Sequence, residues 1–210
     1  DYDTMSEFQE FIAECHKKAE ELGWAFQLHW YDGTNDNGAI TFDQGLGSHN
    51  KGMFGKAGHV VTDMMFSNYN TDKSDLQSSA SYAESMGRDP YDYYKGFDIQ
   101  GRDLSNQYNA RWTDLEGVKA SIGFWGAHSQ GLIHQSATDY GTSDVAIQKA
   151  YLEKQELIFS GANRNPANVP AVNGTTTLAN ASLKNNFHGV ARFNTAKSTI
   201  QAVPFVSRFN

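Results

Sequence analysis

Cysteine is almost absent from this chain of 210 residues, and charged residues are scarce. Cys15 is the single cysteine, so no disulfide can form within the chain. Its place on the apolar stripe of the first expected helix indicates core packing. Charged residues make up 20% of the sequence, the net charge is −7, and lysine and arginine form no cluster. These features argue against nucleic acid and anionic membranes as partners.

Long apolar runs and metal-ligand patterns are also missing. No stretch is long enough to span a bilayer as a helix, and no signal peptide is visible. The seven histidines are scattered, and no pair has a good metal-ligand spacing. Gly45 and Gly47 lack the third glycine and the following helix of a phosphate-binding loop. The sequence therefore predicts no metal, no cofactor and no membrane span.

Aromatic and uncharged polar residues are abundant instead. Aromatics make up 13% of the chain, and Asn, Ser, Thr, Gln and Gly fill the room that charge leaves. Aromatic rings stack on the apolar faces of sugars, so this combination suits a neutral, hydroxyl-rich ligand. The loop aromatics that could stack in this way, although each alone could equally pack within its loop, are Phe42, Phe54, Tyr69, Trp112 and Trp125. Composition alone favours an ordinary secreted domain. The missing disulfides and the Asn-rich loops favour a secreted or cell-surface bacterial protein, with a cytosolic location left open.

The apolar spacing predicts helices that alternate with strands. A three-four repeat from Met5 to Leu22 indicates a first helix, with a capping box at Thr4 and Glu7 and an end at Gly23. The other expected elements are strands at 24–31, 59–69, 94–100 and 118–125, helices at 74–86 and 144–159, and two short strands within 186–209.

This alternation is typical of the α/β class with a parallel sheet. Because there are four core strands and a helix comes first, we expect the second half of a (β/α)8 barrel, strands 5 to 8. Residues 1–161 would form this half, and residues 162–210 would lead out of it into a β module. The alternative is a small open α/β domain of four strands. A half-barrel would leave open strand edges, so we expect the missing N-terminal half as a tightly bound partner with a large interface.

Polar residues gather where the expected strands end. In the first strand, side-chain alternation points Trp30 toward the helices and Tyr31 toward the barrel interior. In the second strand both faces are mostly apolar, so its orientation stays open. Barrel enzymes build their sites at the carboxyl ends of the strands. The residues expected around one opening are Tyr31, Asp32, Asn68, Tyr69, Asp98, Gln100 and Trp125.

Three sequence blocks carry a family resemblance. They read LHWYDG at 28–33, DMMFSNYN at 63–70 and MGRDPYDYYKGFDIQGR at 86–102. In this order and spacing they resemble glycoside hydrolase family 85, and the tail from Phe187 resembles the stretch that leaves that barrel. The resemblance implies an endo-β-N-acetylglucosaminidase that cuts the GlcNAc-β1,4-GlcNAc core of N-linked glycans. It also implies a retaining mechanism in which the substrate's own acetamide is the nucleophile, an exception to the usual pair of carboxylates.

The resemblance also implies roles for individual residues. Tyr31 would be catalytic through contact with the acetamide. The residues expected to line the substrate cleft are Trp30, Asp32, Asn68, Tyr69, Asp98 and Trp125. The family draws its general acid and its acetamide-orienting asparagine from one Asn-x-Glu strand, and no such triplet occurs in these 210 residues. We therefore expect the pair just upstream of Asp1.

Two other functions remain open. A non-catalytic, lectin-like barrel would keep the aromatic and amide rim and lack the acid, and an upstream strand without Asn-x-Glu would favour it. A glycosidase of another barrel family would act on chitin-like substrates and would need paired acids on a strand of this chain, which we do not find. The expected partner in the favoured interpretation is an N-glycan or glycoprotein.

Overall fold

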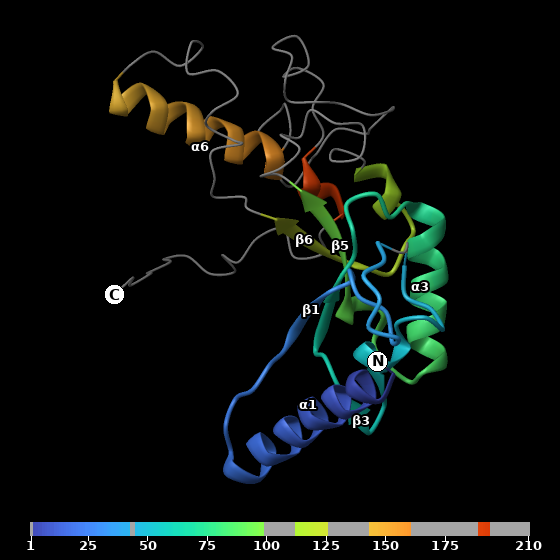
Figure 1. The fold of residues 1–210 in the computed structure, drawn as a ribbon. Helices are drawn as coiled ribbons and strands as arrows, with labels where there is room; N and C mark the ends of the chain where they lie inside the picture. The colour runs from blue at the N-terminus through green and yellow to red at the C-terminus, as the bar shows by residue number, and fades with distance from the viewer. Residues whose placement is uncertain (1, 43–44, 99–111, 126–142, 161–188, 194–210) are drawn as a thin grey trace, which may run out of the picture.

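The computed structural model describes residues 2–42, 45–98, 112–125, 143–160 and 189–193 (Figure 1). The helices and strands follow in this order: α1 Tyr2–Leu22, β1 His29–Tyr31, α2 Lys51–Phe54, β2 Gly55–Lys56, β3 His59–Val60, β4 Met64–Phe66, α3 Lys73–Ser85, β5 Tyr93–Asp98, β6 Ser121–Trp125 and α6 Asp144–Ser160. Short 3-10 helices lie at η1 Pro90–Asp92, η2 Trp112–Leu115 and η5 Val190–Phe193. Within these ranges no helix is long and apolar enough to cross a membrane.

The main sheet has four parallel strands in the order β1-β4-β5-β6. The pairing of β5 with β6 is the longest and runs from Tyr94 opposite Ser121 to Asp98 opposite Trp125. Figure 1 shows α3 along one side of this sheet. The sheet confirms the predicted α/β class, and within the described residues β1 and β6 are its edge strands.

Helix α1 ends as predicted and begins earlier than predicted. The amide of Trp24 donates to the Ala19 carbonyl at 2.9 Å, and that of Gly23 donates to Glu20 at 3.1 Å. This is a Schellman ending, and it requires the left-handed φ of 67° that Gly23 adopts. The predicted capping box at Thr4 is wrong, because the helix already includes Tyr2 and Thr4 lies inside it.

The strands are shorter than predicted. The first pairs only from His29 onward, and the range 59–69 divides into β3 and β4. The division follows from Gly55 and Gly58, whose φ angles of 76° form a tight hairpin between β2 and β3. Asp63 then begins a new direction, and its carboxylate accepts the amide of Leu28 at 2.7 Å. The strand therefore restarts at Met64.

Helix α3 has a complete capping box. The Asp72 carboxylate accepts the amides of Ser74 and Asp75, and Asp75 accepts the amide of Asp72 in return at 3.0 Å. The helix buries Leu76, Ser79, Ala80 and Ala83. The larger core of which it forms part contains Ile12, Leu46, Met53, Phe54, Val61, Met65, Leu76, Ala83, Tyr93, Phe97, Leu115 and Val190.

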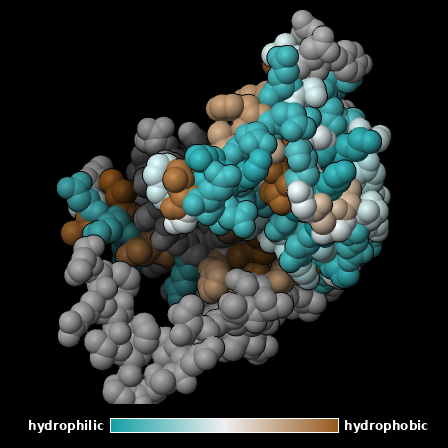
Figure 2. All heavy atoms as spheres, turned by 90° about the horizontal axis from the view of Figure 1, so that it is seen from below, coloured by the Kyte–Doolittle hydropathy of each residue, from teal (hydrophilic) through white to brown (hydrophobic). Residues whose placement is uncertain are grey.

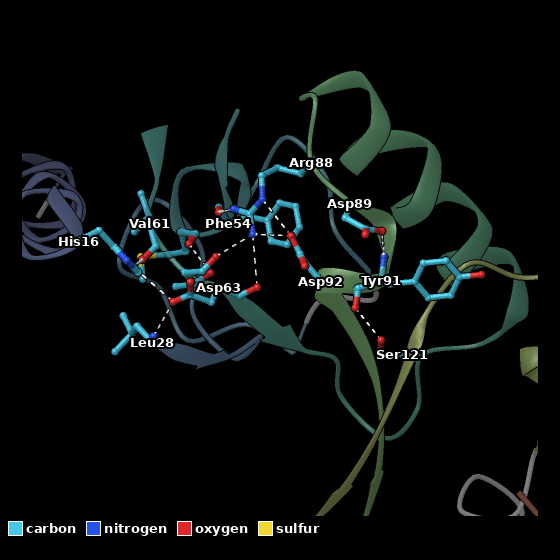
Figure 3. Close-up of polar contacts among 12 residues, drawn as sticks. His16, Leu28, Phe54, Val61, Asp63, Arg88, Asp89, Tyr91, Asp92 and Ser121 are labelled. Atoms are coloured by element: carbon cyan, nitrogen blue, oxygen red, sulfur yellow. Dashed lines mark hydrogen bonds and ion pairs between the residues drawn. The ribbon is translucent and has the colours of Figure 1, made fainter. Parts of the chain in front are cut away.

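The Gly-Arg-Asp-Pro-Tyr-Asp block is structural and precedes β5. The guanidinium of Arg88 lies 4.4 Å from the Phe54 ring centre, donates to the Phe54 carbonyl at 2.6 Å and pairs with Asp92 at 2.8 Å. Asp89 caps η1, and Ser121 donates to the Tyr91 carbonyl at 2.6 Å. Figure 3 shows these contacts. They join the hairpin segment to β5 and β5 to β6 at the amino ends of the strands.

The end of the chain differs from the prediction where it is described. Residues Val190–Phe193 form a 3-10 helix that contacts α6, so a strand there is wrong. The rest of the two strands expected within 186–209 lies outside the described residues, as does the boundary proposed between residues 161 and 162. Figure 2, a view from below, shows a mainly hydrophilic surface with small separate hydrophobic areas.

Candidate functional site

An aromatic cluster covers the sheet face opposite α3. The Tyr31 ring meets the Trp125 ring edge-on, with centres 5.1 Å apart. Phe66 lies 5.3 Å from Trp125 and 4.9 Å from Tyr94. Phe66 therefore shares a face with Tyr31, which settles the orientation of β4 that the sequence left open. Asn68, two residues further on, lies on the same side.

Two glycines make room for this cluster. A Cβ at Gly96 would collide with the Ser67 carbonyl oxygen and would lie 2.7 Å from Nε1 of Trp125. A Cβ at Gly123 would lie 2.6 Å from two carbons of the Phe66 ring. The absence of side chains at these positions of β5 and β6 therefore lets the rings of Trp125 and Phe66 come close to the sheet backbone.

The structure brings four predicted site residues into one pocket. Tyr31, Asp98 and Trp125 are the last residues of β1, β5 and β6, and Tyr69 lies in the turn after β4. Together they line a hollow of about 300 Å³. Ligand pockets in proteins begin at roughly this size. Because all four strands are parallel, their carboxyl ends meet at the same edge, which explains the convergence.

Tyr31 and Asn68 are joined by a hydrogen bond. The Asn68 amide nitrogen donates to the Tyr31 hydroxyl at 3.1 Å. The Asn70 backbone amide approaches Oδ1 of Asn68 at 3.4 Å, which supports this orientation of the side-chain amide. Since the hydroxyl accepts from Asn68, its own proton points elsewhere and is available to an acceptor in the pocket.

Electrostatics keep the Tyr31 hydroxyl protonated. Burial raises its pKa above the ordinary value, and the negative charges of Asp32 and Asp98 and the nearby Tyr69 raise it further. The residue remains 39% exposed, and it lines the pocket. Tyr31 is therefore arranged as a hydrogen-bond donor rather than as a base.

Asp32 has a different place from the one expected. It is buried, and its carboxylate accepts the Asn50 amide at 2.6 Å and the Tyr93 hydroxyl at 3.1 Å. Asn50 also donates to the Gly45 carbonyl at 3.1 Å. Asp32 thus anchors the loop before α2 to β5, and its side chain is not part of the pocket lining. Its influence on Tyr31 is through charge.

Trp30 lies on the opposite side of the sheet from Tyr31. Its ring packs against the core, 6.0 Å from the ring of Phe8 in α1. The sequence predicted this direction and also assigned the residue to the substrate cleft. The structure places it on the helix side, outside the pocket, as alternation along β1 requires.

Several aromatic residues lie in positions that differ from those predicted from the sequence. Phe54, a candidate for sugar stacking, is fully buried against Arg88. Phe42 is exposed at the rim, 6.4 Å from Tyr31. The sequence placed Phe66 on this face only if Asn68 also faced it, which is the case in the structure. Tyr94 was not expected there, although alternation from Asp98 could have indicated it. Gln100 and the side chain of Trp112 lie outside the described part of the chain.

The pocket lining is aromatic and polar. Within the described residues, no three His, Cys, Asp or Glu side chains are grouped closely enough to hold an ion. The pocket instead offers aromatic faces, one carboxylate from Asp98 and the hydroxyl of Tyr31. Such a lining can stack on a sugar ring and hydrogen-bond its hydroxyl and amide groups.

Comparison with solved structures shows a likeness in fold. The glycoside hydrolase domain of Endo-D, Spr0440 from Streptococcus pneumoniae R6, superposes with a TM-score of 0.67 at 19% sequence identity. The match covers 89% of this chain and 27% of that chain, so this chain spans about a quarter of the solved structure. Comparison with curated protein sequences gives no significant match.

The sequence model of the family described as Glycosyl hydrolase family 85 matches residues 1–210. This match extends over all three blocks that carry the resemblance and over the pocket residues. The chain belongs to glycosyl hydrolase family 85.

Proposed function

We propose that this chain contributes the substrate-contact wall of an endo-β-N-acetylglucosaminidase acting on the GlcNAc-β1,4-GlcNAc core of N-linked glycans. The observation that carries the proposal is the Tyr31 hydroxyl, held by Asn68 at the mouth of an aromatic pocket with its proton free to be donated. Family membership and the likeness to the Endo-D domain support a glycosidase. In this proposal Tyr69, Asp98 and Trp125 contact the glycan.

The proposed chemistry uses the substrate's acetamide as the nucleophile. Its carbonyl oxygen attacks the anomeric carbon, the glycosidic bond breaks, and a general acid gives its proton to the leaving oxygen. Tyr31 would donate a hydrogen bond to the acetamide carbonyl oxygen and so hold the group in position for attack. The raised pKa of Tyr31 suits this role because a donor must keep its proton. Water then opens the cyclic intermediate with retention of configuration.

The proposed fold of the complete enzyme is a (β/α)8 barrel. The four parallel strands would be strands 5 to 8, and residues 1–161 would form the second half. Strand β1 is an edge strand within the described residues, and Phe11 and Trp24 nearby are 64% and 69% exposed. Polypeptide supplied from outside residues 1–210 would pair with β1, cover this surface and contribute the Asn-x-Glu pair.

The test is a deglycosylation assay on a high-mannose glycoprotein with the protein as it is naturally expressed. Intact mass under native conditions would show whether further polypeptide accompanies the chain. We expect release of the glycan with one GlcNAc left on the protein, and strong loss of release in Tyr31→Phe. Lys119→Met, which changes an exposed lysine far from the pocket, is the control.

The other outcomes separate the alternatives. A protein that binds N-glycan and releases none of it would identify the lectin-like function. Cleavage of chitin oligomers but not of glycoproteins would favour a different glycosidase. Full activity in Tyr31→Phe would remove the hydroxyl from the mechanism and contradict the proposal as stated.

A further inference from the structure

Lys95 is a buried cation that the proposed chemistry does not use. It lies in β5 between Tyr93 and Phe97, on the face toward α3, and its side chain has no solvent exposure. Lysine is rarely fully buried, because removing an ammonium from water is costly unless its donors are satisfied. A lysine held in this position therefore calls for an explanation in the contacts that it makes.

The ammonium of Lys95 is bonded to one turn. It donates to the backbone carbonyl of Tyr69 at 2.7 Å and to that of Thr71. It also lies 5.4 Å from the centre of the Phe97 ring. The negative charge of Asp75 at the start of α3 lies near enough for each group to influence the other. The charge is thus surrounded by backbone oxygens, an aromatic face and a carboxylate.

The turn held by Lys95 connects β4 with α3 and carries two pocket features. Tyr69 lines the pocket, and Asn68 binds the Tyr31 hydroxyl. Within the turn, the Thr71 amide donates to the Asn68 carbonyl at 3.2 Å and the Asn70 amide approaches Oδ1 of Asn68 at 3.4 Å. Two carbonyls pointing at one ammonium add a restraint from the opposite side of the sheet.

We propose that Lys95 is a positioning residue that fixes the turn Asn68–Thr71, and through it the wall at Tyr69 and the bond from Asn68 to Tyr31. The proposal deepens the proposed function, since the ligand it serves is the glycan in this pocket. Lys95 itself touches no substrate, because it lies on the face of β5 opposite the pocket. Its influence is carried by backbone carbonyls, so it is independent of the side chain at position 69.

The test compares Lys95→Met with wild type by hydrogen–deuterium exchange, without ligand. Methionine fills a similar volume and donates no hydrogen bond. We expect the amides of residues 68–71 to exchange about tenfold faster, with α1 and β6 unchanged, because the restraint is local. In the control variant Lys119→Met, which changes an exposed lysine, the amides of residues 68–71 should exchange at the wild-type rate. Unchanged exchange at 68–71 in Lys95→Met would overturn the proposal.

A second measurement covers the case in which Lys95→Met does not fold. In the wild type, nitrogen-15 NMR of the lysine ammonium groups should show one signal with slow solvent exchange and couplings to the carbonyl carbons of Tyr69 and Thr71. The absence of those couplings would overturn the proposed role of Lys95 without the need for any variant.

A third measurement, binding of N,N′-diacetylchitobiose, tests whether the restraint by Lys95 affects the pocket. We expect about tenfold weaker binding in Lys95→Met, and a Tyr31→Phe change that has less effect in the Lys95→Met background than alone. Equal binding in Lys95→Met and wild type would contradict the positioning role. A wild type that binds no chitobiose would count against the proposed function, while the exchange result would still decide the role of Lys95.

Discussion

The side-chain amide nitrogen of Asn68 lies 3.1 Å from the Tyr31 hydroxyl oxygen and donates a hydrogen bond to it. The two residues are 37 positions apart in sequence and lie at the ends of the neighbouring parallel strands β4 and β1. This bond turns an exposed tyrosine into an oriented donor. It links the last residue of β1 with the turn after β4, so the geometry of one strand end depends on the other.

Asn68→Ala tests this dependence. We expect about a fivefold loss of glycan release, because a side-chain hydrogen bond is worth about 1 kcal/mol and 1.4 kcal/mol corresponds to a factor of ten. Tyr31→Phe should lose more, since the donor itself disappears. The double variant should match Tyr31→Phe alone in kcat/KM, because the amide then has no hydroxyl to orient. Additive losses would mean that Asn68 acts separately.

Trp125 and Trp30 should respond differently to ligand. Trp125 lines the pocket and Trp30 packs against α1. Titration with N,N′-diacetylchitobiose should change the tryptophan fluorescence of the wild type and of Trp30→Phe, and should have little effect in Trp125→Phe. A stable Trp30→Phe variant that lost the response would contradict the placement of Trp30 outside the pocket.

Gly96→Ala should destabilise the protein and distort the pocket. The added Cβ would meet the Ser67 carbonyl and the Trp125 indole, and overpacking costs roughly 1–3 kcal/mol. Urea unfolding is the measurement. Gly58→Ala is the control. Nothing lies within 4 Å of a Cβ added at this position, so only the left-handed φ of +76° should lower the stability of that variant, by about 1 kcal/mol. Equal losses in the two variants would mean that the sheet adjusts around position 96.

The sequence predicted the fold class and the polar ends of the strands, because alternation of hydrophobic and polar residues is a local signal. It could not divide the range 59–69 into β3 and β4, since the hairpin depends on how Gly55 and Gly58 turn the chain. It placed Tyr31, Tyr69, Asp98 and Trp125 correctly at one edge. Whether they bind substrate stays a prediction.

Asp32 and Trp30 show where such reasoning ends. Both belong to the same sequence block as Tyr31, and adjacency in sequence favoured one shared role. In the structure Trp30 faces the helices, and Asp32 is buried under Asn50 and Tyr93. The partners of Asp32 come from 18 and 61 residues away, so no local pattern indicates them. Lys95 was missed for the same reason.

Arg88 should be a main determinant of stability. Its guanidinium satisfies the Phe54 and Thr62 carbonyls and pairs with Asp92 in a buried position. Removal of the guanidinium leaves two buried carbonyls without this donor, which costs about 1–3 kcal/mol for each group. Arg88→Met should therefore lower the urea midpoint strongly, whereas Lys119→Met, which removes an exposed pair with Glu84, should leave it unchanged. Similar midpoints would show that the Arg88 network contributes little.

Tyr93 should make the protein sensitive to alkali. Burial and the neighbouring charge of Asp32 raise the pKa of its hydroxyl well above the ordinary value, which is about 10 in the unfolded chain. Above that pH the unfolded chain releases a proton that the folded protein keeps, so the free energy of unfolding falls as pH rises. Urea unfolding from pH 8 to 11 should show a plateau and then a decline. Tyr93→Phe should be less stable on the plateau, because Asp32 loses a hydrogen bond, and should decline less steeply. An equally steep decline in Tyr93→Phe would assign the alkaline sensitivity to other groups, such as Tyr31, whose pKa is also raised.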